Sequence, residues 1–126
     1  MKDSNLINKD INFIYDENNI FFKIITGKLP AKKIYEDEKL LIFHDIHPID
    51  DIHLLVIPKN KFINFTHFIS EASQEDILHF FNKINDITKE KNIKNYKLLT
   101  NNGKLAGQVI EHFHFHIIAH NESFAR

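Results

Sequence analysis

The strongest constraint on the fold is the stretch HFHFHII near the C-terminus, in which three histidines alternate with two phenylalanines. On an α-helix, residues two positions apart point in different directions, so both residue types would be scattered around the axis. On a β-strand, alternate side chains share one face. The pattern therefore predicts a strand with His112, His114 and His116 on one face and the phenylalanines packed in the core on the other.

The rest of the chain is predicted to supply a small antiparallel sheet and two helices. Ser73 followed by acidic residues resembles a helix N-cap, and the apolar residues after it recur at helical spacing, which predicts one long helix over 74–91. A short N-terminal helix is expected over 20–28, ending at Gly27 and Pro30. The connections are too short for several crossover helices, so we expect an α+β fold. Strands are predicted over 32–36, 39–44, 52–59, 95–100 and 112–118.

Length and composition indicate one ordinary globular domain. The 126 residues suit a single domain, which we expect over 18–126 after a loose leader over 1–17. Sixteen basic and 17 acidic residues give a net charge of −1, which argues against nucleic-acid and membrane surfaces as partners. The chain has no cysteine, no apolar run of membrane-spanning length and no apolar stretch typical of a signal peptide at its start. A cytoplasmic protein is expected.

The histidine row has three possible interpretations. It can be a tolerated polar row on a solvated sheet face. It can bind a metal, although a strand separates the ends of the row by about 13 Å, so one ion would need another ligand such as His53. It can also be catalytic, because a neutral imidazole attacks phosphorus and carries the transferred group, while its neighbours bind oxygens and move protons.

The motifs also resemble a known family. HFHFHII matches the signature His-φ-His-φ-His-φ-φ, with φ apolar, of the histidine triad (HIT) superfamily. The stretch NNIFFKIITGKLPAKKIYEDEKLLIFHDIHP is similar to the N-terminal region of the Hint-like branch, and LLVIPK and AGQ follow at the expected places. The resemblance runs from about Asn18 to Ile118.

This resemblance implies a homodimer with one sheet continued across both subunits. It also implies a hydrolase that binds purine nucleotides, cleaves nucleoside 5′-phosphoramidates or acyl-nucleotides through a nucleotidyl-histidine and releases AMP or GMP without a metal or other cofactor. By position, His114 is the nucleophile, supported by three other histidines, and Asp45 binds the ribose. The supporting histidines are His112, His116 and His53; the base pocket comprises Ile20, Phe21, Ile24, Phe43 and Ile46; the phosphate side comprises Asn101, Gly107, Gln108 and Val109. His44, His47, His67, His79 and His120 are interpreted as surface or structural residues.

Two departures from the family pattern keep other functions open. Val109 stands where the family usually has serine or threonine, and so offers a backbone N–H but no hydroxyl. The C-terminal segment IIAHNESFAR lacks the usual glycine pair or Pro-Arg. A nucleotide-binding interaction protein with weak catalysis, or a dinucleoside polyphosphate hydrolase, are therefore the alternatives.

Overall fold

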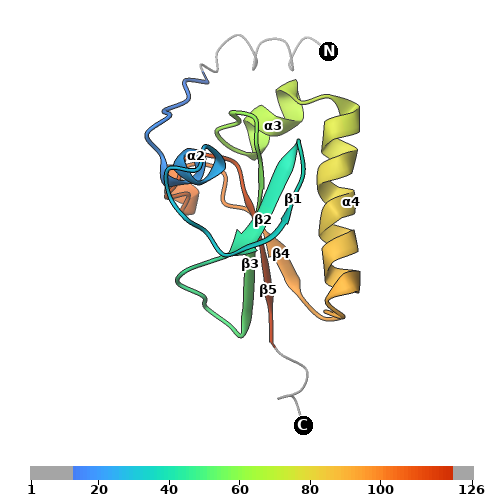
Figure 1. Cartoon of the computed structure of the whole chain (residues 1–126). Coiled ribbons are helices and arrows are strands. Elements are labelled where there is room, and N and C mark those ends of the chain that lie inside the picture. The colour runs from blue at the N-terminus through green and yellow to red at the C-terminus, as the bar shows by residue number, and fades with distance from the viewer. Residues whose placement is uncertain (1–12, 121–126) are drawn as a thin grey trace.

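The fold is a five-stranded antiparallel sheet with helices on both faces (Figure 1). The computed structural model describes residues 13–120. Strand order in the sheet is β1-β2-β3-β5-β4, and every neighbouring pair is antiparallel. The predicted α+β class and strand number are therefore confirmed. The strands are β1 (Lys33–Glu36), β2 (Leu40–His44), β3 (Ile52–Pro58), β4 (Lys97–Leu99) and β5 (Phe115–Ala119).

Both predicted helices are present, and a third was not predicted. The long helix α4 (Gln74–Glu90) begins where its capping pattern indicated, since the Ser73 hydroxyl accepts the backbone N–H of Asp76. The additional helix, α3 (Phe65–Glu71), has only one cap residue, Asn64, as its sequence signal. None of the helices in the described part of the chain is long and apolar enough to cross a bilayer. The remaining elements are α2 (Ile20–Ile25) and the 3-10 turn η1 (Lys104–Ala106).

Alternation along β2 and β3 builds a core on each face of the sheet. Leu40, Ile42, Leu54 and Val56 pack with the apolar residues of α4 and with Phe113. The intervening residues, Leu41, Phe43, Leu55 and Ile57, pack against Phe21 and Ile24 of α2. Both faces are covered, which explains why these strands are apolar at almost every position. The α2 face also carries the histidines.

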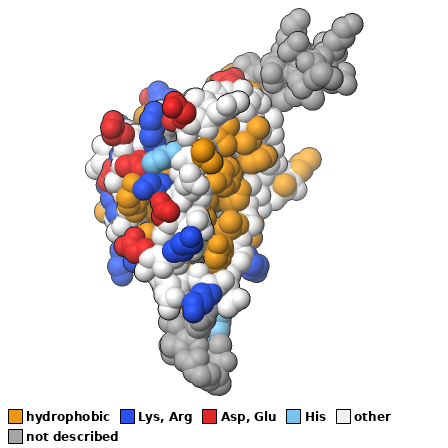
Figure 2. Space-filling view, turned by 90° about the vertical axis from the view of Figure 1, so that its right-hand side faces the viewer, with side chains coloured by type: hydrophobic (Ala, Val, Ile, Leu, Met, Phe, Trp, Pro, Cys, Tyr) orange, Lys and Arg blue, Asp and Glu red, His pale blue; other side chains and the backbone are white. Residues whose placement is uncertain are grey.

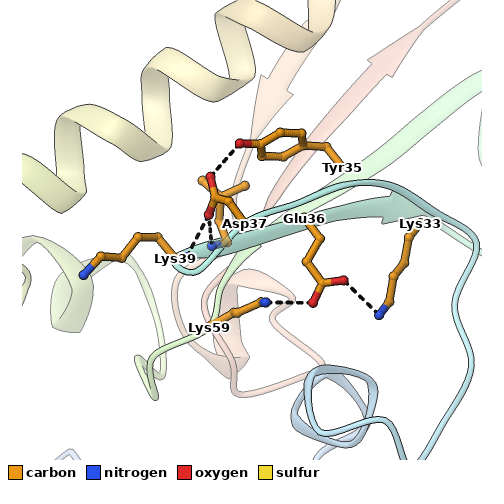
Figure 3. Close-up of polar contacts among 7 residues, drawn as sticks. Lys33, Tyr35, Glu36, Asp37, Lys39 and Lys59 are labelled. Carbon is orange, nitrogen blue, oxygen red and sulfur yellow. Dashed lines mark hydrogen bonds and ion pairs between the residues drawn. The ribbon is translucent and has the colours of Figure 1, made fainter.

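A polar network around Asp37 holds the β1–β2 turn (Figure 3), and His79 links this turn to α4. The Asp37 carboxylate accepts hydrogen bonds from the Tyr35 hydroxyl and from the backbone N–H groups of Lys39 and Leu40, and it also bonds His79 of α4. Burial alone would raise the pKa of Asp37, but these hydrogen bonds outweigh it and hold the pKa well below its usual range. The network lies away from the histidine row and is structural.

The described end of the expected leader contacts the domain. The Phe13 ring stacks on His67 with centroids 4.1 Å apart and an interplanar angle of 4°. Tyr15 hydrogen-bonds His112, and Glu17 pairs with Lys61. Residues 13–17 therefore form a strap over the domain rather than a loose leader, while residues 1–12 lie outside the described part.

Candidate active site

The sheet register brings two of the four predicted histidines into direct contact. His116 of β5 lies opposite Leu55 of β3, and His53 lies two residues along β3 on the same face. His53 Nε2 is 2.8 Å from His116 Nδ1, and the His116 ring is 5.1 Å from that of His114 between centroids.

Three of the seven residues of the predicted histidine strand are not part of the sheet ladder. β5 begins only at Phe115, so the expectation of a strand from His112 is wrong for its first three residues. The physical reason is that the backbone there bonds elsewhere: the Phe113 N–H donates to Phe62, and the His114 carbonyl accepts the Thr100 hydroxyl. The alternation still holds, because Phe113 and Phe115 pack on Phe80 of the α4 core.

Hydrogen bonds fix the tautomers of His112 and His114. His112 Nε2 lies 2.7 Å from the Pro58 carbonyl, which can only accept, so Nε2 carries the proton. His114 Nδ1 lies 2.6 Å from the carbonyl of His112, so the proton of His114 sits on Nδ1. In the neutral ring this leaves a lone pair on His114 Nε2. A neutral histidine held in this tautomer is a competent nucleophile.

The second histidine pair is also held in one tautomer. The backbone N–H of Ile49 donates to His53 Nδ1 at 3.2 Å, so the neutral ring is protonated on Nε2. That N–H faces His116 Nδ1 at 2.8 Å and Asp45 Oδ2 at 3.3 Å. His116 then carries its own proton on Nε2. The two rings form a short chain along which a proton can move.

Burial keeps the histidine row neutral near pH 7. Desolvation lowers the pKa of His112 to about 4 and outweighs the hydrogen bond to Pro58, which raises it; the neighbouring His114 adds a smaller lowering. Desolvation and the neighbouring His114 and His53 lower the pKa of His116 to about 4. The pKa of His114 is lowered by desolvation, although Asp45 and the carbonyl of His112 oppose the shift.

Two adjoining cavities open beside these histidines. The catalytic cavity, about 350 Å³, is lined by His53, His114 and His116. The apolar cavity, about 410 Å³, lies between α2 and the strands of the sheet. Asp45 lines both, so a carboxylate stands where the apolar and the histidine-lined spaces meet. The shared lining residues are Phe21, Asp45, His47, Leu55 and Ile110.

The apolar cavity contains the five residues expected for a base pocket, together with several that sequence reasoning missed. Ile20, Phe21, Ile24, Phe43 and Ile46 all line it. His44 and His47, interpreted as surface or structural, also line the site; both flank Asp45, and that proximity in sequence was the available signal. The other lining residues not predicted are Leu29, Pro30, Ala31, Leu55 and Ile110.

On the phosphate side, three of four expected residues line the catalytic cavity: Asn101, Gly107 and Val109. Gln108 does not. Its amide nitrogen donates to the carbonyls of Ile63 and Ile110, and its oxygen accepts the N–H of Gly103. Both side-chain donors are therefore occupied, and Gln108 holds the loop in place rather than a phosphate. The ring nitrogens of His112 are likewise both bonded, and His112 does not line the cavity.

The same hydrogen bonds show whether these side chains are suited to bind a metal ion. Ligand atoms of Asp45, His53 and His116 lie within 4.8 Å of one another, a spacing that one ion could use. A metal at His53 Nε2 would require the proton on Nδ1, but Nδ1 already accepts the N–H of Ile49. The donor set therefore does not fit a resident metal ion.

Comparisons with known proteins identify relatives of this chain and of its fold. The HIT domain family model matches residues 26–123. A HIT-like protein of Rickettsia prowazekii is 53% identical over 83% of this chain and 89% of its own length. The adenosine 5′-monophosphoramidase of Candida albicans is 40% identical over 79% of this chain and 68% of its own. The solved structure of a HIT family hydrolase from Clostridium thermocellum is 32% identical, covers 85% of this chain and 94% of that one, and superposes with a TM-score of 0.73.

The match to the Candida enzyme agrees with the Hint-like branch that the sequence motifs indicate. The family model spans most of the chain, and the histidine signature lies inside the matched residues. On these grounds the chain belongs to the HIT family.

Proposed function

We propose that this protein is a HIT hydrolase that cleaves purine nucleoside 5′-phosphoramidates or acyl-nucleotides. The observation that carries the proposal is the tautomer of His114, a buried, neutral histidine that lines the catalytic cavity and whose Nε2 lone pair has no partner among residues 13–120. The apolar cavity offers walls for a purine, and Asp45, at the junction, offers two oxygens that can each accept a ribose hydroxyl. The Candida relative is named an adenosine 5′-monophosphoramidase.

In the first step, His114 Nε2 attacks the α-phosphorus, and the bond from phosphorus to the leaving nitrogen breaks. The leaving amine needs one proton. A bound phosphate adds negative charge beside His116, which raises the pKa of that ring, so the His53–His116 pair can carry and deliver this proton.

In the second step, water attacks the phosphorus of the nucleotidyl-His114. The now neutral His53–His116 pair takes the proton of the water, and the bond between phosphorus and His114 breaks to release AMP. The pair returns to its starting protonation state, so protons balance over one cycle. The backbone N–H of Val109, which has no acceptor among residues 13–120, can stabilise charge on the phosphoryl oxygens.

The test is AMP release from adenosine 5′-phosphoramidate by the wild type and by His114→Ala. We expect turnover by the wild type, none by the variant, and AMP binding by both. His120→Ala, which changes an exposed histidine outside the cavities, is the matched control and should retain full activity. Denatured, quenched wild type should carry a nucleotidyl group that His114→Ala lacks.

Two other results would favour the alternative functions. AMP binding without turnover by the wild type would favour the nucleotide-binding module, with Val109 as the first residue to examine. Faster cleavage of a dinucleoside polyphosphate than of the phosphoramidate would favour the polyphosphate hydrolase.

A further inference from the structure

A contact outside the mechanism above links the N-terminal strap to the histidine row. The hydroxyl of Tyr15 lies 2.5 Å from His112 Nδ1, although the two residues are 97 positions apart in the chain. Since the His112 proton is on Nε2, Nδ1 accepts and Tyr15 donates. The Tyr15 ring also packs edge-on against that of His112, with centroids 5.5 Å apart.

The strap is held at points on either side of this hydrogen bond. Phe13 stacks on His67, whose Nδ1 accepts the backbone N–H of Ile63. Beyond Tyr15, Glu17 pairs with Lys61. These contacts limit the movement of the Tyr15 hydroxyl relative to the row, as a positioning contact requires.

The ring of His112 is fully buried and does not line the cavity, so it can influence the site only through another group of the same residue. Its backbone carbonyl, however, accepts the Nδ1 proton of His114 and so sets the tautomer of that ring. With only the Pro58 bond, the ring of His112 could rotate and exchange its two nitrogens. Tyr15 and Pro58 together bond both nitrogens, which leaves one orientation and one tautomer.

We infer that Tyr15 is a positioning residue for His114, acting through the ring and carbonyl of His112. The inference rests on the proposed function where it concerns rate, but its effect on the histidines is measurable without turnover. It also assigns the strap, residues 13–17, to the active site.

The experiment compares wild type with Tyr15→Phe, which removes one oxygen and keeps the ring. Tyr35→Phe is the matched control, because it removes a hydrogen-bonded hydroxyl in the turn network far from the histidine row. Each protein is measured for kcat and KM with adenosine 5′-phosphoramidate. Each is also labelled with ¹⁵N-histidine, so that NMR reports which ring nitrogens of His112 and His114 carry protons.

For Tyr15→Phe we expect kcat to fall about tenfold, as for the loss of one hydrogen bond that orients a reacting group, with KM within about twofold. The Nδ1 signal of His112 should move and His114 should lose its single tautomer, while Tyr35→Phe leaves both residues unchanged. Unaltered His112 and His114 signals in Tyr15→Phe would overturn the inference, and so would wild-type kcat. If the wild type releases no AMP, the proposed function fails, and the NMR comparison alone decides the role of Tyr15.

Discussion

At the scale of single residues, the site depends on which atoms are already bonded. Asp45 accepts the backbone N–H of His47 with one oxygen, and its other oxygen lies 3.3 Å from His53. A carboxylate has about four acceptor positions, so both oxygens can still accept ribose hydroxyls. By the same reasoning Gln108 holds the loop rather than a phosphate, because its side-chain amide already makes three hydrogen bonds to backbone groups.

Asp45→Ala is predicted to weaken binding of AMP more than binding of 2′-deoxy-AMP. A hydrogen bond to a charged group contributes about 1.5–3 kcal/mol, so AMP should lose roughly ten- to a hundredfold in affinity. Calorimetric titration of both nucleotides measures the difference. Asp50→Ala, which changes a carboxylate outside both cavities, should leave both affinities unchanged. Equal losses for the two nucleotides in Asp45→Ala would remove the ribose role.

Val109→Ser is predicted to raise kcat for adenosine 5′-phosphoramidate by up to about tenfold. Val109 is 90% exposed and lines the catalytic cavity, so a hydroxyl there can donate to the phosphate or the leaving group without repacking a core. Leu105→Ser is the matched control, because it places the same hydroxyl on the same loop outside the cavity lining. If kcat rises in both variants, or does not rise in Val109→Ser, the missing hydroxyl at position 109 is not what limits kcat.

At the scale of elements, β5 and the segment leading into it hold two histidines, His116 and His112, whose pKa values fall to about 4. An unfolded histidine has a pKa near 6.5, so between pH 6.5 and pH 4 the unfolded chain binds more protons than the folded one. Stability should therefore be full above pH 6.5 and decrease as the pH falls toward 4. For the fully buried His112 alone, the loss is predicted to reach roughly 3 kcal/mol.

Urea unfolding at several pH values between 7 and 4.5 measures this effect. His112→Asn removes the titrating ring and should flatten the dependence, while His120→Asn, on the exposed surface, should leave it as in the wild type. A wild-type stability that stays constant from pH 7 to 5 would show that these rings are not held neutral by the fold.

The elements differ in how far the sequence could predict them. Alternation predicts the faces of β5, and the Ser73 cap predicts the start of α4, because both signals come from neighbouring residues. Helix α3 has one cap and two turns, too short for a helical period to be recognised. The tautomer of His112 could not be predicted, because the two atoms that set it, the Pro58 carbonyl and the Tyr15 hydroxyl, are distant in sequence.

At the scale of the whole molecule, one sheet edge and one side surface suit a second subunit. β4 pairs only with β5, so its other edge is open among the strands of residues 13–120. An open edge offers unpaired backbone groups to another strand. The side of the molecule that carries α4 displays a band of apolar side chains (Figure 2). Both features fit the expected homodimer with a continuous sheet.

The prediction is that the wild type elutes as a homodimer of about 30 kDa, twice the 14.9 kDa of the chain, when light scattering follows size exclusion. Leu98 lies in β4 with 42% of its surface exposed, and Leu98→Asp should shift the mass to that of one chain, because a buried, unpaired carboxylate is costly at an apolar interface. Ile69→Asp is the matched control, since Ile69 of α3 is equally exposed. A monomeric wild type at micromolar concentration would contradict the dimer. Dissociation by Ile69→Asp alone would show that the interface lies away from β4. If Leu98→Asp is monomeric and still releases AMP, each subunit carries a complete site.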